Sequence, residues 1–313
     1  MSDEMRAIAM GVHVLDVLVR PVEQIPEGQG GQLVEQIKVT AAGSAGGAAL
    51  VLGKLGANVK SAGAIGTDAV GDMLLRLLER DGVDTSLLVR RDDVQTSASV
   101  LPIRPTGERP AFHVVGANGT YGPDDAPWDE IANATHLHLG GPEFMGGEAA
   151  AQILSRARDG GAVTSADILA PGDMGVFEWI APILPHLDYL LPNDEQVLGF
   201  TGESDLAAGC RALVERGAGC VIATRGADGV LIVDADGEEP VPAFEVDVVD
   251  TTGCGDALSA GFLRGLALGR DRRAAAELGC ATAALVAQGL GTDHGDYDLA
   301  TAERFAAETP ARA

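Results

Sequence analysis

The chain has 313 residues, of which 46% are hydrophobic and only 4% aromatic, so its core should consist mainly of Ala, Val, Leu and Ile. Its formal net charge of −24 disfavours nucleic-acid backbones and anionic membrane surfaces as partners, because dense negative charge would be repelled. The four cysteines lack CxxC spacing and no apolar run approaches membrane-spanning length. We therefore expect reduced thiols and a cytoplasmic protein that binds neither nucleic acid nor membrane.

The first part of the chain alternates between extended and helical patterns. Strands are predicted at 7–10, 12–19, 33–39 and 59–65. Ala48, Leu52 and Leu55 fall on one face of a predicted helix, which Gly56 should end.

Two further extended segments interrupt this alternation. Ser97–Ile103 and Ala111–Val115 flank the turn signal Pro105-Thr106-Gly107, a pattern typical of a β-hairpin. With the segment at 33–39, they predict either a small antiparallel lid that stands off the main sheet or an extra antiparallel edge of that sheet. Glycine-rich links beside these segments could let a lid move.

From Thr135 onward strands and helices alternate regularly. The predicted strands are 136–139, 162–166, 189–191, 220–224, 229–233 and 245–249. The predicted helices are 148–158, 176–184, 205–216, 255–268 and 272–287. This order favours a parallel sheet with helices on both faces and ligands bound at the carboxyl ends of the strands.

The motif Asp-Thr-Thr-Gly-Cys-Gly-Asp at 250–256 lies between a predicted strand and a predicted helix. Gly253 and Gly255 allow the backbone to pack closely and to aim N–H groups at one point, where a helix N-terminus already favours negative charge. A phosphoryl group in transfer suits such a point. Asp256 could accept a proton from an attacking hydroxyl or could only stabilise the helix dipole, and the local chemistry leaves both roles open.

This motif resembles the signature of the ribokinase-like, or PfkB, carbohydrate kinases, in which the Gly-x-Gly-Asp turn forms an anion hole and its Asp is the base. The resemblance implies catalytic roles for Asp256, Gly253, Cys254 and Gly255, with Cys254 where Ala is usual. Cys254 keeps a small side chain at that position and could serve only in packing.

The same resemblance implies an α/β, ribokinase-like fold: a central, mostly parallel sheet flanked by helices on both faces, with a small β lid. We expect a single domain over residues 1–313 with lid strands inserted at about 31–41 and 96–117. Because the lid often mediates dimers in this family, the resemblance also implies a homodimer through the lid.

A second segment, 42–71, is similar to the N-terminal signature of the family, a Gly-Gly turn that opens a helix and a later Gly-rich loop. The resemblance implies that Asp16, Gly43, Ser44 and Gly47 bind the substrate. Gly47 stands where an Asn usually reaches the substrate hydroxyls. The carboxylate of Asp16 could accept hydrogen bonds from two sugar hydroxyls or, on local grounds, could cap its own turn.

Residues 191–196 resemble the Asn-x-x-Glu motif of the family, which helps to hold magnesium and phosphate, usually through water. Gln196 occupies the position where Glu is usual, so either Glu195 or the Gln196 amide could serve the magnesium shell. A helix cap is the alternative role of Asn193.

Residues 221–229 look like the nucleotide loop of the family, and 281–291 like its adenine wall. The resemblance implies that Asn193, Thr224, Gly226 and Gly229 bind ATP, although a strand that ends in a tight hairpin would explain the loop equally well. Arg225 could add a cation near the phosphates.

Asp250 and Thr252, with carbonyl groups of residues 289–295, match positions that bind a monovalent cation in many members of the family. Oxygen ligands suit potassium, and a nearby cation would help to order the anion hole. The resemblance therefore implies ATP, Mg²⁺ and a potassium site.

The function that follows is an ATP-dependent kinase that transfers the γ-phosphoryl group to a hydroxyl of a small sugar or sugar-like substrate, with a nucleoside kinase as the alternative. A sugar phosphate is the weakest acceptor, because the basic residues in or before the hairpin, including Arg104 and Arg109, could be surface charge. A non-catalytic sugar or nucleoside sensor is a second alternative, against which the intact Asp256 argues.

Overall fold

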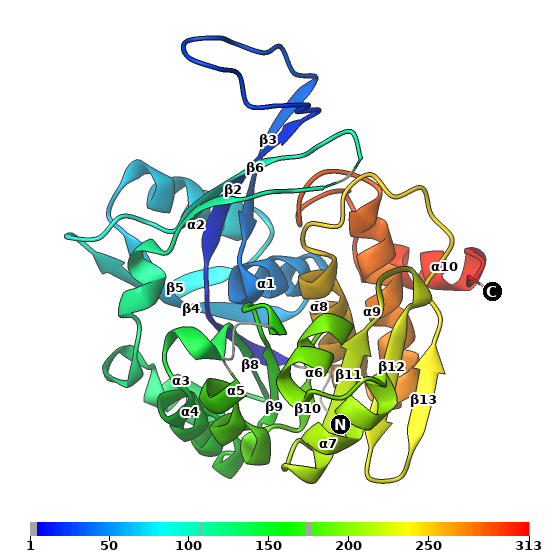
Figure 1. Ribbon diagram of the computed structural model, residues 1–313. Helices are drawn as coiled ribbons and strands as arrows, with labels where there is room; N and C mark the ends of the chain where they lie inside the picture. Colours follow the sequence, from blue (N-terminus) through cyan, green and yellow to red (C-terminus); the bar gives the residue numbers. More distant parts are fainter. Residues whose placement is uncertain (1–4, 107, 173–176, 313) are drawn as a thin grey trace.

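The computed structural model describes residues 5–106, 108–172 and 177–312. Gly107 of the predicted turn and Val176 at the start of a predicted helix lie outside the described residues. The chain forms a large sheet between two layers of helices and a smaller sheet that stands above it in Figure 1. This is the predicted α/β arrangement with a mostly parallel central sheet.

The large sheet has nine strands in the order β13-β12-β11-β10-β9-β8-β1-β4-β5. Neighbours from β5 to β11 are parallel, and β12 is antiparallel to both of its neighbours. The bounds are β1 Arg6–Gly11, β4 Asn58–Gly66, β5 Asp84–Arg91, β8 His136–Gly140, β9 Val163–Asp167, β10 Tyr189–Leu190, β11 Cys220–Thr224, β12 Val230–Asp234 and β13 Glu238–Val241.

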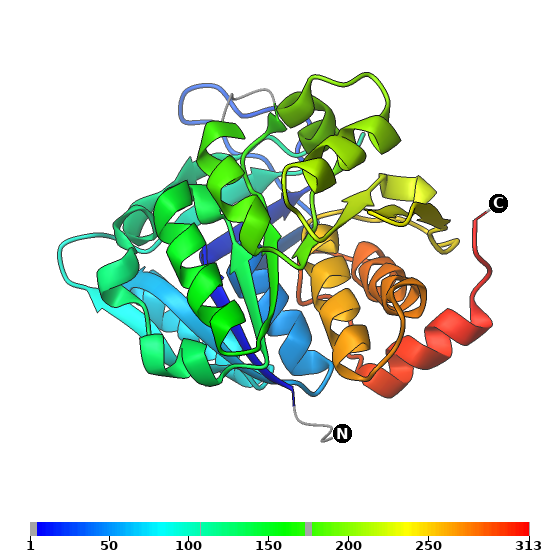
Figure 2. The ribbon, with the colours of Figure 1, turned by 90° about the horizontal axis from the view of Figure 1, so that it is seen from below.

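Helices cover both faces of this sheet (Figure 2). One layer contains α1 Ser44–Lys54, α2 Ala69–Arg80, α8 Cys254–Ala267, α9 Arg272–Ala287 and α10 Leu299–Glu308. The other contains α3 Trp128–Asn133, α4 Gly147–Asp159, α5 Phe177–Ile180, α6 Asp194–Thr201 and α7 Leu206–Glu215. Strand β1 shows why two cores form: Ala7 and Ala9 enter the first, and Ile8 and Met10 the second.

The smaller sheet, called the lid sheet below, has four strands in the order β3-β2-β6-β7. Their bounds are β2 Val14–Arg20, β3 Gln36–Ala42, β6 Ala98–Pro102 and β7 Phe112–Val114. The alternative of an extra edge on the main sheet is therefore wrong. The lid is not wholly antiparallel as predicted, because β2 pairs with β6 in parallel, whereas the β2–β3 and β6–β7 pairs are antiparallel. Only Val12 and His13 separate β1 from β2, so the chain passes directly from the large sheet into the lid sheet.

Three predicted elements differ in the structure. Residues 245–249 form no strand: the N–H groups of Glu245 and Val249 donate to the carbonyls of Pro310 and Ala287 and not to a neighbouring strand. The described part of the predicted helix 176–184 changes at Ile180 into a 3₁₀ helix, Ala181–His186, that contains Pro182 and Pro185, which lack the N–H of an α-helical bond. The lid strand predicted at 33–39 begins at Gln36, where its pairing with β2 starts.

Candidate active site

The predicted catalytic turn lies at the N-terminus of α8. Gly253 is the N-cap of this helix and has a φ of 79°, in the left-handed region that favours glycine. A Cβ at Gly253 would lie 2.2 Å from Oγ1 of Thr292, so the close approach of these two segments also requires glycine. Cys254 contributes packing: burial raises the pKa of its thiol to about 12, and Sγ donates to the carbonyl of Ala283 at 3.6 Å.

Asp256 lies in the first turn of α8 and reaches the N-terminal part of α1. A Cβ at Gly47 would lie only 2.2 Å from Oδ2 of Asp256. The carboxyl group of Asp256 therefore occupies space that a side chain at position 47 would fill. In this chain Gly47 makes room for the predicted base.

Three carboxyl groups lie near one another around this point: Asp16 is buried, and Asp256 and Asp167 are half-buried. Burial and the negative charge of Asp16 raise the pKa of Asp256 to about 8. Burial also raises the pKa of Asp16 to about 6, against the opposing effects of the Ser99 hydroxyl and the Arg109 charge. The pKa of Asp167, at the end of β9, lies well above its usual range because of burial and the charges of Asp256 and Glu143. A carboxyl group whose pKa is close to neutrality is suited to general-base catalysis.

Sequence reasoning missed Asp167. The signal that could have found it is a polar side chain at the carboxyl end of a buried strand, where parallel sheets bind their ligands.

The predicted substrate residues lie at the junction of the lid sheet and α1. Gly43 is the N-cap of α1 with a φ of 84°, and a Cβ there would lie 2.6 Å from the carbonyl oxygen of Val12. Ser44 follows it, and its buried hydroxyl has no hydrogen-bond partner among the described residues. The hydroxyl of Ser44 is thus free to bind a ligand.

Asp16 belongs to a polar row that crosses the lid sheet. The strand registers place Thr40 on β3 and Ser99 on β6 directly beside Asp16, and His113 on β7 beside Ser99. The Ser99 hydroxyl and Nδ1 of His113 are 3.0 Å apart. This row, called the polar row below, provides several hydrogen-bonding groups on one face of the lid sheet.

A cavity of about 380 Å³ adjoins the catalytic turn. Its lining includes Thr224, Gly226 and Gly229 of the predicted nucleotide loop together with Cys254 and Gly255. Small residues of α9 form one wall, as predicted for part of the stretch 281–291; they are Ala283, Ala284 and Ala287. The structure thus brings the predicted nucleotide loop, helix wall and catalytic turn together.

Arg312, near the C-terminus, also lines this cavity, and sequence reasoning missed this contribution. The backbone N–H of Glu245 donates to the carbonyl of Pro310 at 2.9 Å, and that of Arg312 to the carbonyl of Ala243 at 2.8 Å. Residues 309–312, called the tail below, thereby hold the segment that carries Phe244 and Val246 against the cavity, and Arg312 itself lines it.

Asn193 caps α6 beside Thr224, with which it forms an isolated parallel bridge. Gln196 completes the cap: its Oε1 accepts from the N–H of Asn193 at 2.9 Å. Nε2 of Gln196 donates to the carbonyls of Ile168 at 2.7 Å and Ala170 at 3.0 Å, which a glutamate could not do. The Gln196 side chain is therefore fully used within the protein, whereas Glu195 is exposed.

Two arginines near the site have specific partners. Nη2 of Arg225 donates to the carbonyl of Asp228 in its own loop at 2.8 Å, and Arg225 is not part of the cavity lining. Arg109, between β6 and β7, reaches the catalytic turn, where Nη1 donates to Oγ1 of Thr252 at 2.6 Å and lies 3.9 Å from Oδ1 of Asp250.

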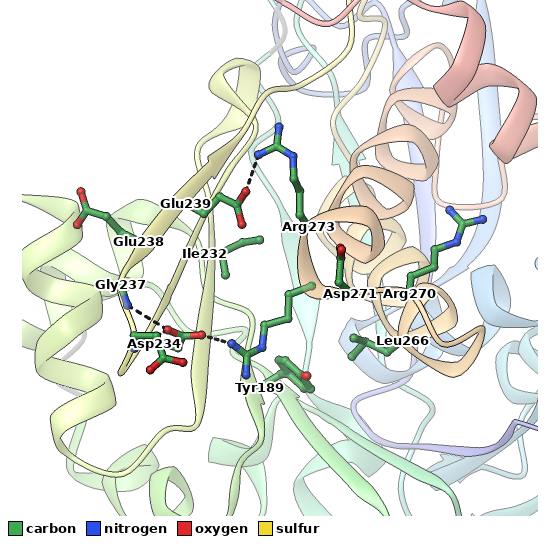
Figure 3. Close-up of a pocket in the computed structure, with 12 residues that line it drawn as sticks. Tyr189, Ile232, Asp234, Gly237, Glu238, Glu239, Leu266, Arg270, Asp271 and Arg273 are labelled. Carbon is green, nitrogen blue, oxygen red and sulfur yellow. Dashed lines mark hydrogen bonds and ion pairs between the residues drawn. The ribbon is translucent and has the colours of Figure 1, made fainter. Parts of the chain in front are cut away.

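A larger cavity, of about 890 Å³, lies elsewhere, between the β12–β13 hairpin and the start of α9 (Figure 3). Its guanidinium groups are paired with carboxylates: Arg273 with Glu239 at 2.8 Å, and Arg272 with Asp234. Tyr189, at the start of β10, places this cavity toward the amino ends of the parallel strands. It is remote from the catalytic turn, whereas the smaller cavity adjoins that turn.

Comparison with known proteins decides the family. The model of the pfkB family carbohydrate kinases matches residues 11–298. The chain belongs to this family. As a pfkB-family carbohydrate kinase, it is a phosphotransferase with a hydroxyl acceptor, and the family predicted from the two glycine-rich signatures is confirmed.

Relatives of this pfkB-family chain are kinases. It is 29% identical over 258 residues to the ATP-dependent ribose-1-phosphate kinase of Halopiger xanaduensis, which covers 82% of this chain and 83% of that protein. It is 26% identical to the nucleoside kinase of Methanothermobacter thermautotrophicus over 98% of each chain.

Solved structures of ribokinases share the fold of this pfkB-family chain. The ribokinase of Thermotoga maritima superposes with a TM-score of 0.81 at 23% identity, over 96% of this chain and 99% of that one. The Arabidopsis thaliana ribokinase in complex with ribose and ATP gives a TM-score of 0.83 at 19% identity, over 97% and 99%. None of the helices in the described ranges is long and apolar enough to cross a membrane.

Proposed function

We propose that the chain transfers the γ-phosphoryl group of ATP to a hydroxyl of a small sugar or nucleoside, with Asp256 as the base. The observation that carries this proposal is the position of Asp256. Its half-buried carboxyl group, with a pKa of about 8, lies in the turn that also lines the cavity of about 380 Å³, to which we assign the nucleotide. The negative charge of Asp16, on the polar row, contributes to this raised pKa. A base between a hydroxyl-binding row and a nucleotide cavity suits phosphoryl transfer.

In the proposed reaction, Asp256 accepts the proton of the acceptor hydroxyl as its oxygen forms a bond to the γ-phosphorus. The bond from the γ-phosphorus to the bridging oxygen of ADP breaks. The N–H groups of 253–256, at the N-terminus of α8, stabilise the charge that develops on the transferred group.

Magnesium is proposed to bind together with ATP. Among the described residues, no group of three or more His, Cys, Asp or Glu side chains is arranged to hold a metal ion. This fits Mg²⁺, which usually keeps several waters and binds mainly through substrate phosphates. Asn193 and the exposed Glu195, at the start of α6, are the proposed water-mediated contacts, and a bound Mg²⁺ would neutralise phosphate charge.

The acceptor is proposed to bind to Asp16, Ser44 and the backbone of Gly43, with Gly47 leaving space for Asp256. Both free sugars and nucleosides offer the pair of hydroxyls that a carboxylate such as Asp16 can bind. The nucleoside alternative is supported by the relative that matches 98% of the chain. A sugar-phosphate acceptor is supported by the name of another relative and disfavoured by the buried carboxyl groups of the site.

A homodimer through the lid sheet is also proposed. Its support is an apolar row on the face opposite the polar row, formed by the paired residues Val39, Val17, Val100 and Phe112, of which Val17 is half-buried and the other three are exposed. Large exposed apolar patches favour association with another protein surface. The single domain over residues 1–313 and the cytoplasmic location stay predictions.

The test is ADP release with ATP and Mg²⁺ across a panel of free sugars, sugar acids, sugar phosphates and nucleosides, with the Asp256→Ala variant as the blank. Turnover with one class of acceptor, lost in the variant, is the expected result. Binding of an acceptor without turnover would instead support the sensor. Wild-type turnover in Asp256→Ala would remove Asp256 from the mechanism.

A further inference from the structure

The carboxylate of Asp250 is buried beside the catalytic turn, with a side-chain exposure of only 1%. Its Oδ1 accepts from the N–H of Thr252 at 3.2 Å and from the hydroxyl of Thr252 at 2.9 Å. Its Oδ2 accepts from the N–H of Gly291 at 3.4 Å. A buried carboxylate also needs a positive charge nearby.

Arg109 provides that charge. Its Nη1 donates to Oγ1 of Thr252 at 2.6 Å and is 3.9 Å from Oδ1 of Asp250. The Thr252 hydroxyl thus accepts from the guanidinium and donates to the carboxylate. The guanidinium adjoins the two side chains that the family resemblance assigns to a monovalent cation.

The loop at 289–295, which the resemblance assigns to the same cation, already binds other cationic side chains. Nζ of Lys54 donates to the carbonyl of Asp293 at 2.9 Å and to that of Gly295. The carboxylate of Asp293 lies 3.2 Å from Nζ of Lys38 and 3.0 Å from Nη2 of Arg80. Two carbonyls of this loop are therefore directed to an ammonium group.

We propose that this site takes no monovalent cation, and that the guanidinium of Arg109 supplies the positive charge beside the catalytic turn. The inference rests on the proposed kinase function. A potassium ion bound to Thr252 and Asp250 would lie close to the guanidinium, and repulsion between like charges would oppose its binding.

Arg109 acts through Thr252, the residue before Gly253, and is therefore a positioning residue. It lies on the connection between β6 and β7 of the lid sheet, whereas Asp250 and Thr252 belong to the main body of the chain. The positive charge that orders the turn is thus brought by the lid sheet. The guanidinium of Arg109 can reach Thr252 only while the lid sheet packs against the part of the chain that contains the large sheet.

The first experiment compares the wild type in K⁺, Na⁺ and tetramethylammonium chloride at equal ionic strength. We expect kcat to differ by less than about twofold among the salts, and thallium-205 NMR, with Tl⁺ as the potassium probe, to detect no bound ion. Activation by K⁺ beyond that range, or a bound Tl⁺, would overturn the inference.

The second experiment removes the guanidinium. We expect Arg109→Ala to lower kcat about tenfold in tetramethylammonium, to alter the KM for ATP much less, and to gain activation by K⁺ together with Tl⁺ binding. Arg109→Lys, which keeps the charge, should retain more activity than Arg109→Ala. Unchanged kcat in Arg109→Ala, or failure of that variant to gain Tl⁺ binding, would contradict the assignment.

The matched control is Arg104→Ala. Arg104 lies on the same connection, but its guanidinium binds the carbonyl of Glu23 and lies 3.9 Å from the Glu108 carboxylate, so kcat and cation response should stay at wild-type values. Circular dichroism checks that each variant is folded. Tl⁺ binding is measured without turnover. A failed kinase assay would therefore disprove the proposed function, while the Tl⁺ measurement would still test whether the site binds a monovalent cation.

Discussion

Asp256 holds its proton more firmly than an ordinary carboxyl group, because burial and the charge of Asp16 raise its pKa to about 8. Asp256 must be deprotonated to act as a base. We therefore expect kcat/KM to rise with pH, with the midpoint of the rise near this pKa and a plateau above it. In Asp16→Asn the nearby charge is gone, and the midpoint should move to lower pH. A pH-rate profile of each protein measures the shift, and identical midpoints would contradict the coupling.

The same pKa predicts an effect on stability. The folded-state pKa of Asp256 lies above the unfolded value, so the native state binds more protons and the free energy of unfolding falls as pH rises from about 4 to about 8. Asp256→Asn should therefore raise Tm at pH 8 by at least about 2 °C and have little effect near pH 4. Glu195→Gln, at an exposed site, is the control. Equal Tm shifts of Asp256→Asn at pH 8 and pH 4 would contradict this prediction.

Gly47 offers a sharper test of the position of Asp256. Gly47→Ala places a methyl group where Oδ2 lies, so the carboxyl group must rotate away, and kcat should fall at least about tenfold with a smaller change in the KM for ATP. Gly46→Ala, one residue earlier in α1, meets His13, with its ring at 3.2 Å and its Cα at 3.6 Å, and does not approach Asp256, so it should lower kcat much less than Gly47→Ala. Equal activity of the two variants would show that Asp256 is not held there.

The catalytic turn could be predicted from the sequence because its chemistry is local. Gly253 and Asp256 lie within one short motif, and the structure places both at the helix start that this motif indicates. Asp167 and Arg109 could not be found in this way, because separate strands and connections bring them to the turn. The role of Gln196 could not be predicted either, because only its hydrogen bonds to the carbonyls of Ile168 and Ala170 show that its amide is used within the protein.

Among the elements, the tail has the clearest functional consequence. It pairs with the segment 243–245 and holds it against the nucleotide cavity. Deletion of residues 309–313 should raise the KM for ATP several-fold and leave the KM for the acceptor nearly unchanged, because the polar row lies elsewhere. Initial-rate kinetics with each substrate varied measure both constants. Arg312→Ala should produce part of the effect, and an unchanged KM for ATP in the deletion would contradict this role.

Elements with strong periodicity could be predicted, and those that depend on partners could not. The helix predicted at 272–287 has the bounds of α9. The segment 245–249 has an equally clear alternation, yet it forms no strand, because its N–H groups at Glu245 and Val249 bond to Pro310 and Ala287. Alternation shows only that a segment could join a sheet, and tertiary structure decides whether a neighbour is available.

At the scale of the whole molecule, the apolar row of the lid sheet predicts the assembly. Phe112→Glu and Val100→Glu should each convert the proposed dimer into a monomer, because each places a charge in the apolar row. Light scattering coupled to gel filtration measures the mass. Leu33→Glu, at a fully exposed site before β3, is the control and should leave the mass unchanged. A monomeric wild type would contradict the proposed dimer.

The architecture as a whole was predictable from the order of strands and helices together with the two glycine-rich signatures. The composition of the lid sheet was only partly predictable. Strand β2 follows β1 after two residues, and nothing in its pattern shows that it leaves the large sheet. Its pairing with β3 and β6, which are distant in sequence, places it in the lid sheet.

Because successive residues of a strand point to opposite faces, the lid sheet presents the polar row on one side and the apolar row on the other, displaced by a single residue along each strand. A slip of one residue in the pairing of β2 would turn Asp16 outward and Val17 inward. A misfolded lid of this kind would lose its acceptor site and its dimer surface together. If the proposed dimer forms, the chains that assemble correctly are therefore also the chains that can bind substrate, so dimerisation would select the competent fold.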